Sequence, residues 1–185
     1  MDFEQEVVMR LRNDSRYPED AVRCLVAFAG EGRDLAYTYV QVMDGQRATT
    51  GRAYRRVPRW VEAPASARYL VVLRIGPPDR FPSSNIWTRA RWRTVLPTDH
   101  ARLINARTRV VGGRLQVLSL VEEPYGGKRS PVVTYRDWEE GLLAIAAHEF
   151  YHIYQFKNRL PTVEASCEEY AAQRLAAWRL QHRTT

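Results

Sequence analysis

The spacing of apolar residues changes twice along this 185-residue chain. Near the N-terminus it is helical, and two helices are expected there, one over 3–11 and one that follows Pro18 and ends before Gly30. The middle is rich in β-branched and aromatic residues, as strands are. Strands are predicted over 37–43, 68–75, 86–96, 103–111, 115–121 and 131–135.

Helical spacing returns in the C-terminal region, 137–182. Asp137 and Glu140 form an Asp-x-x-Glu capping box, and the apolar face that follows continues to about Lys157. An Asn-Arg-Leu-Pro stop signal comes next, and a further helix runs to about His182. This region is therefore expected to form a helical hairpin.

These patterns predict an α+β fold with N-terminal helices, a mainly antiparallel meandering sheet and the C-terminal helical hairpin. Gly112-Gly113 lies between two expected strands and indicates a tight turn, because both turn positions favour positive φ. No internal repeat or low-complexity tract is present. We therefore expect a single domain over 1–185, in which 1–60 could form an N-terminal appendage.

Composition excludes several classes of protein. Apolar residues make up 45% and charged residues 26%, which are ordinary globular values and exclude a disordered chain. The longest apolar stretches, such as 142–147, are too short for a membrane span, and the acidic N-terminus is unlike an export signal, so we expect a cytoplasmic protein without membrane contact. Cys24 and Cys167 are too few for a disulfide framework, and both are expected to be reduced and buried.

The net charge of +7 is unevenly distributed. Fifteen arginines and three acidic residues lie between Arg47 and Arg114, whereas 137–185 holds five basic and seven acidic residues. A strongly positive surface would attract nucleic acid or another acidic partner. An arginine-rich genome would produce the same bias without any selection for binding.

The sharpest functional signal is the sequence His148-Glu149-Phe150-Tyr151-His152. Two histidines four residues apart project from one face of a helix, so both imidazoles can reach a single cation. The carboxylate of Glu149 lies beside them, where it can address a metal-bound water. Because this helix is otherwise apolar, burying a His–Glu pair on it would be costly without a compensating partner.

Two carboxylates on the following helix can complete this site. Glu164 and Glu168 are four residues apart and therefore share one face of that helix, where they can oppose the histidines. Glu164 lies about one turn into the helix and Glu168 one turn further. Spacing alone allows either residue to be the third ligand.

In these residues the chain resembles the gluzincin metallopeptidases, whose H-E-x-x-H helix is followed by a helix with a glutamate ligand in an E-x-x-x-D/E pattern. The resemblance covers about 137–172 and implies a minimal, single-domain, zincin-like member. It implies that the Zn2+ ligands are His148, His152 and Glu164, that the general base is Glu149, and that a ligand histidine is oriented by Glu168. Glutamate stands here where aspartate is more usual. The metzincin continuation of the motif is absent.

The function implied by this resemblance is zinc-dependent hydrolysis of peptide bonds in a peptide or protein substrate. Zinc with three protein ligands keeps one position open for water, whose proton Glu149 takes and passes to the leaving amine. In minimal members of the family a strand edge before the helix binds substrate as an added strand. The candidate here is 115–121.

Other interpretations of the same residues are open. The histidines and glutamates could belong to a degenerate site or to a buried polar network. Cys167 is expected to pack in the core, because Glu164 and Glu168 fill that helix face. His100 and His182 are expected at the surface. Packing is also expected for three residues that could donate to an oxyanion, Tyr151, Tyr154 and Tyr170.

A basic strand over 87–93 is the second functional feature. Alternation places on one of its faces Trp87, Arg89, Arg91 and Arg93, and a similar pattern recurs at Arg107 and Arg109. Such a face could grip phosphates and stack a base, as single-strand binders do, or could be a solvated surface. The alternative function is thus a catalytically inactive zincin-like module that binds nucleic acid or an acidic partner. A peptidase directed to nucleic-acid-bound proteins would combine both, as SprT-like zincins look to do, although their third histidine is absent here.

Overall fold

The computed structural model describes residues 9–46, 48–95, 107–124 and 131–182, without the side chains of 87–90. The chain forms two compact units: unit 1 comprises Met1–Ser84 with Val133–Thr185, and unit 2 comprises Asn85–Val132. The sequence predicted a single domain over 1–185; among the described residues, the strands of unit 2 pair with one another and with no strand of unit 1. The predicted α+β class is confirmed.

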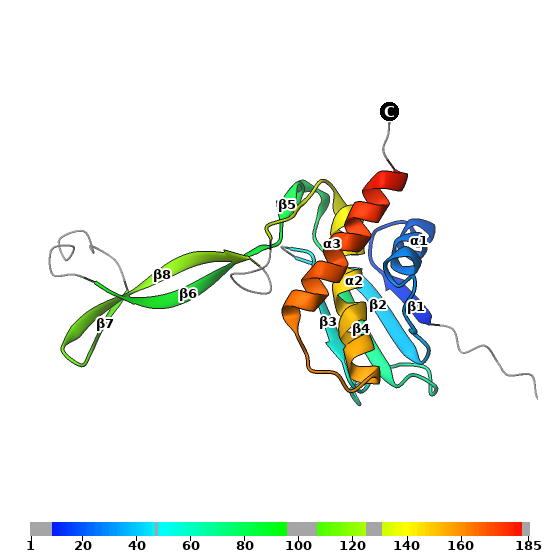
Figure 1. Cartoon of the computed structure of the whole chain (residues 1–185), viewed down its shortest axis with the longest axis horizontal. Coiled ribbons are helices and arrows are strands. Elements are labelled where there is room, and N and C mark those ends of the chain that lie inside the picture. The colour runs from blue at the N-terminus through cyan, green and yellow to red at the C-terminus, as the bar shows by residue number, and fades with distance from the viewer. Residues whose placement is uncertain (1–8, 47, 96–106, 125–130, 183–185) are drawn as a thin grey trace, which may run out of the picture. The chain divides into compact units, whose positions relative to one another are not determined.

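Unit 1 is built on a four-stranded sheet with the order β1-β2-β4-β3 (Figure 1). The strands are β1 (Arg10–Asp14), β2 (Thr38–Asp44), β3 (Thr50–Tyr54) and β4 (Tyr69–Ile75). β1 and β4 both run parallel to β2, and β3 pairs antiparallel with β4. Parallel neighbours need a crossover, which α1 (Glu19–Ala29) supplies between β1 and β2. The expected antiparallel meander is therefore wrong for this sheet.

The N-terminal region is part of this sheet. Leu11, expected in a helix, lies in β1, where backbone pairing with β2 overrides the helical spacing; 1–8 lie outside the described residues. The helix after Pro18 is confirmed as α1. Because β1, β2 and β3 supply three of the four strands, 1–60 is not an appendage.

Alternation along the strands gives the sheet two different faces. One face packs on the helices and is lined by Val40, Val42, Val71, Leu73 and Ile75. The other carries Tyr39, Leu70 and Val72, which pack against apolar residues of the 57–67 stretch that precedes β4. The larger core therefore lies between the sheet and the helices.

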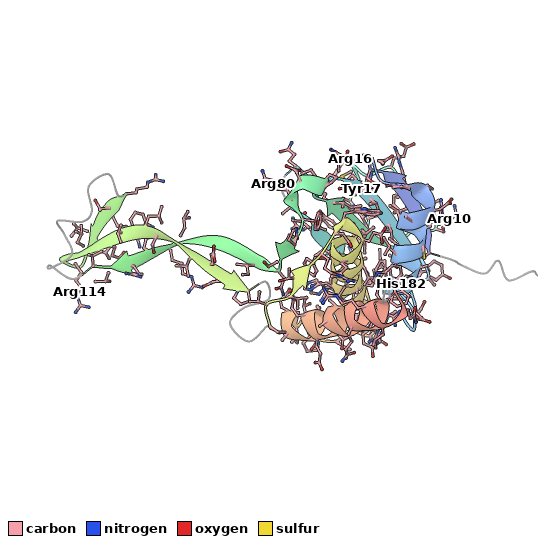
Figure 2. All side chains as sticks on the ribbon, turned by 90° about the horizontal axis from the view of Figure 1, so that it is seen from above. Arg10, Arg16, Tyr17, Arg80, Arg114 and His182 are labelled. Atoms are coloured by element: carbon pink, nitrogen blue, oxygen red, sulfur yellow. The ribbon has the colours of Figure 1, made fainter. Side chains whose placement is uncertain are left out.

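Two long helices complete unit 1, as the sequence predicted: α2 (Trp138–Lys157) and α3 (Glu164–Gln181). α2 packs on β3, β4, α1 and α3, and thirteen of its twenty residues are buried. Figure 2 shows α2 almost end-on, with α3 beside it. Val163 precedes α3 as its N-cap and is exposed.

Three short elements link the two parts of unit 1. A 3-10 turn, η1 (Pro78–Arg80), leads to β5 (Ser83–Ser84), which pairs antiparallel with β9 (Thr134–Tyr135). The prediction of a strand over 131–135 is thus confirmed at its C-terminal end. Within the described ranges, no helix combines the length and apolar character needed to cross a membrane.

Unit 2 is a three-stranded antiparallel sheet with the order β6-β8-β7. Its strands are β6 (Ile86–Thr94), β7 (Thr108–Val111) and β8 (Arg114–Pro124), each inside or overlapping a predicted strand. Gly112 and Gly113 have φ values of +56° and +73°, which confirms the tight turn between β7 and β8. Arg114 begins β8 directly after this turn (Figure 2).

An ion cluster around a buried carboxylate joins the start of α2 to the end of α3. Asp137 caps α2 by accepting the Glu140 backbone N–H at 2.9 Å, as the capping box predicted. The Glu140 carboxylate accepts the backbone N–H of Arg136 at 2.8 Å and the guanidinium groups of Arg136 and Arg179 at 2.6–2.9 Å. Burial opposes ionisation of this carboxyl, but the hydrogen bonds from Arg179 and Arg136 outweigh it and lower its pKa from 4.5 to about 2.

Replacing Glu140 with glutamine should therefore lower the free energy of unfolding at neutral pH by about 3 kcal/mol. The folded-state pKa lies below the unfolded one, so this contribution is complete above about pH 4.5 and is lost as the pH falls toward about 2. Urea unfolding of wild type and variant should give stabilities that converge over this range. Glu169→Gln, an exposed change on α3, should stay within about 0.5 kcal/mol of wild type. A difference in unfolding free energy between wild type and variant that stays constant at all pH values would show that the pKa of Glu140 is not lowered by folding.

Candidate metal centre

The antiparallel packing of α2 and α3 brings together four polar residues predicted from the sequence. His148 and His152 lie one turn apart on α2, and both are buried. Glu164 is the first residue of α3, and Glu168 lies one turn further on. Glu168 is buried, whereas the Glu164 side chain is 50% exposed, so one side of the cluster is open to solvent.

The carboxylate of Glu164 faces both imidazoles. Its Oε2 lies 3.3 Å from Nε2 of His148, and its Oε1 lies 3.5 Å from Nε2 of His152. A tetrahedral zinc ion with bonds of about 2.0–2.1 Å holds its ligand atoms about 3.3–3.4 Å apart. Each of these two nitrogen-to-oxygen distances is therefore close to the spacing of two ligands on one ion.

The opposite nitrogen of each ring faces an acceptor. Nδ1 of His148 lies 3.2 Å from Oε1 of Glu168. Nδ1 of His152 lies 3.1 Å from Oε1 of Gln155, whose amide donates to the carbonyl of Val163 at 3.3 Å. With a proton on each Nδ1, held by these acceptors, both Nε2 lone pairs would be free to bind an ion beside Glu164.

Cys167 offers a second set of ligands that sequence reasoning missed. It is buried, as expected, but its Sγ lies 3.4 Å from Nδ1 of His152. Together His148, His152 and Cys167 form a buried group that could hold a metal ion, with ligand atoms within 4.8 Å of one another. Burial and the neighbouring carboxylates raise the pKa of the Cys167 thiol, which opposes the thiolate that metal binding requires.

Two residues that were not predicted to contact the ligand histidines, Gln155 and Cys167, could have been found from helical spacing. Gln155 follows His152 by three residues, and Cys167 follows Glu164 by three, so each lies beside a predicted ligand on its own helix. Cys24, also expected to be buried, is exposed. It lies off the buried face of α1, which consists of Val22, Leu25, Val26 and Ala29.

Charge at the centre favours a cation. Burial opposes protonation of His148, but Glu164 and Glu168 outweigh it and raise its pKa to about 9. Burial and His148 lower the pKa of His152, and the hydrogen bond with His148 lowers that of Glu164. Without an ion the carboxylates thus hold a proton on His148, which a metal would displace.

Glu149 faces the sheet. Its carboxylate accepts a hydrogen bond from the backbone of Ala53 in β3, and burial raises its pKa to about 7. A Cβ on Gly51 would lie 2.5 Å from Cγ of Glu149 and 2.8 Å from its Oε1. Only glycine therefore lets β3 approach this carboxylate so closely.

Within unit 1, the sheet edge beside the centre is β3. β3 lies at the end of the strand order and packs on α2. The segment 115–121 belongs to β8 in unit 2, where Gln116 and Val117 pair with strands on both sides. The sequence did not single out β3, because Thr-Gly-Arg-Ala-Tyr has small residues where a strand pattern would have apolar ones.

The tyrosines predicted to pack do so around Arg33. Its guanidinium lies 4.5–4.9 Å from the ring centroids of Tyr151, Tyr154 and Tyr170. The Tyr170 hydroxyl also donates to the carbonyl of Ala29 at 3.1 Å. His182 is exposed at the end of α3 (Figure 2), as expected. Its ring stacks on that of Trp178. His100 lies outside the described residues.

The predicted arginine-rich face belongs to unit 2. The side chains of Trp87 and Arg89 lie outside the described ones, whereas Arg91 and Arg93 are exposed. Arg107, which precedes β7, is also exposed. Arg109 lies on the opposite face, where its guanidinium covers the Trp92 ring at 4.3 Å.

Comparison with protein-family models, with curated proteins and with solved structures finds no match to this chain. The chain's own residues therefore carry the functional conclusions that follow.

Replacing Gly51 with alanine should destabilise the protein by about 1–3 kcal/mol, because the new methyl overlaps Glu149 and Ile145. Urea unfolding measures this loss, and Thr50→Ala, at an exposed position of the same strand, is the control. The penalty should shrink in a Glu149→Ala background, which removes the overlapping carboxylate. An equal penalty in both backgrounds would show that Gly51 and Glu149 are not in contact.

Proposed function

We propose that this protein is a zinc-dependent hydrolase, most specifically a metallopeptidase of the gluzincin type. The observation that carries the proposal is the convergence of the His148 and His152 Nε2 atoms on the carboxylate of Glu164 at 3.3 and 3.5 Å. These three residues would hold the ion. Glu168 would act through His148, by accepting its Nδ1–H at 3.2 Å.

The donor set supports a catalytic role over a purely structural one. Two imidazoles and one carboxylate are a common set in catalytic zinc sites, whereas structural sites use four protein ligands. The half-exposed Glu164 gives solvent and substrate a route to the open position. When bound there, zinc would lower the pKa of water and polarise a carbonyl.

Glu149 is the candidate general base. It follows a proposed ligand directly in the sequence, but its carboxylate is held toward β3 by the Ala53 backbone and would stay free of the ion. A pKa near 7 suits a group that accepts a proton from water and returns it to the leaving amine. Its burial supplies that pKa.

A peptide substrate is favoured by the position of β3. This strand lies at the sheet edge and contacts the helix that carries Glu149, so an extended peptide added to that edge would pass the centre. The partner of the site is therefore proposed to be a peptide or protein in extended conformation.

The set with Cys167 is the main alternative. An ion held by Sγ and the His152 Nδ1 would displace the Gln155 contact and leave Glu164 without a role. It would also need a thiolate in a place where burial raises the thiol pKa. These features favour an ion bound by the two Nε2 atoms and Glu164.

Glu149→Gln should keep about one zinc ion per chain and lose at least about 100-fold in turnover, because the amide cannot accept the proton. Elemental analysis gives the metal content, and cleavage of a peptide library gives the activity. Glu169→Gln, an exposed isosteric change, should alter neither. Unchanged turnover in Glu149→Gln would refute the mechanism, and loss of zinc would show that Glu149 is a ligand.

Three variants separate the ligand sets by zinc retention under mild chelation. Glu164→Ala should empty the site, and Glu168→Ala should weaken zinc binding by about 10- to 100-fold, the usual effect of removing support from a ligand histidine. Cys167→Ser should retain zinc. Loss of zinc from Cys167→Ser but not from Glu164→Ala would place the ion on the cysteine side.

A further inference from the structure

Unit 2 holds nearly all of the chain's excess positive charge. Of its 48 residues, nine are Lys or Arg and three are Asp or Glu, a net of +6 out of +7. The rest of the chain has nineteen basic and eighteen acidic residues. A genome-wide preference for arginine would affect both parts alike, so the excess in unit 2 reflects a local depletion of acidic residues.

The geometry of unit 2 distributes this charge over both faces of a ribbon. β6 and β8 pair over nine consecutive positions, from Ile86 with Pro124 to Thr94 with Gln116. By alternation Arg91 and Arg93 share one face, whereas Arg109 and Arg114 share the other with Trp92. All four arginine side chains are exposed.

Most of these charges are available to a partner. Among the described residues, Arg91 has an ion pair, with Glu123 at 2.5 Å, whereas Arg93 and Arg114 have none. Arg109 is held by neutral groups, the Gln116 amide oxygen at 2.8 Å and the Trp92 ring. These contacts orient its guanidinium without neutralising it.

We propose that the β6–β8 ribbon of unit 2 binds duplex DNA in the major groove. That groove admits a two-stranded β-ribbon, and a ribbon inside it meets a phosphate backbone on each side. Long arginine side chains on either face of so narrow a ribbon can reach past the strand edges to these phosphates, whereas a single strand offers one backbone and would need one basic face. The major groove of duplex RNA is too narrow for side chains to read. The proposal does not depend on the metal centre.

The test is binding of the full chain to a fluorescent DNA duplex of about 20 base pairs, followed by polarisation at several salt concentrations. If about four phosphates are neutralised, the association constant should fall about 100-fold between 50 and 200 mM salt. Arg93→Ser with Arg114→Ser should reduce the slope of log K against log salt by about two. Arg93→Lys with Arg114→Lys, which keeps both charges, should have the wild-type slope.

Arg10→Ser with Arg59→Ser is the matched control, because it removes the same charge from exposed positions of unit 1. This control should keep the wild-type slope. An equal loss in both double variants would overturn the proposal, since net charge alone would then drive binding. Tighter binding to a single strand of the same length, or to polyglutamate, would overturn the choice of duplex DNA. Circular dichroism of each variant excludes unfolding as the cause.

Discussion

Helix α2 is enclosed by β3 and β4, by α1 and by α3, and each polar side chain that it buries needs a hydrogen-bonding or charged partner. At its start, Glu140 binds Arg136 and Arg179. At its centre, His148 meets Glu164 and Glu168 from α3, and Glu149 meets the backbone of β3. The same constraint thus fixes the register of α2 against α3 and the distance between α2 and the sheet.

The candidate centre follows from this arrangement. Burial without an ion leaves His148 protonated between two carboxylates, which is a site prepared for positive charge. The acceptors at both Nδ1 positions orient the two rings so that Nε2 of His148 and of His152 faces Glu164. Gly51 completes the arrangement by letting β3 reach Glu149.

Some of these features could be predicted from sequence patterns and others could not, for physical reasons. His148, Glu149, His152, Glu164 and Glu168 could be grouped in advance because they lie on two consecutive helices, where periodicity shows which side chains share a face. The role of β3 could not be predicted, because its contact with Glu149 requires a residue without a side chain, Gly51. The parallel pairing of β1 with β2 could not be predicted either, because the two strands are separated in sequence by a crossover and local patterns do not show which strands pair. The Gly112-Gly113 turn was accessible because its backbone requirement is local.

The central claim is that the ion binds on the Nε2 side of the two histidines, with Glu164 and without Cys167. X-ray absorption spectroscopy at the zinc edge, on the purified protein, tests this most directly because nitrogen or oxygen and sulfur ligands differ in distance. An ion bound on this side should have only nitrogen and oxygen neighbours at about 2.0–2.2 Å, with two imidazoles among them. A sulfur neighbour at about 2.3 Å would contradict it and move the ion to Cys167.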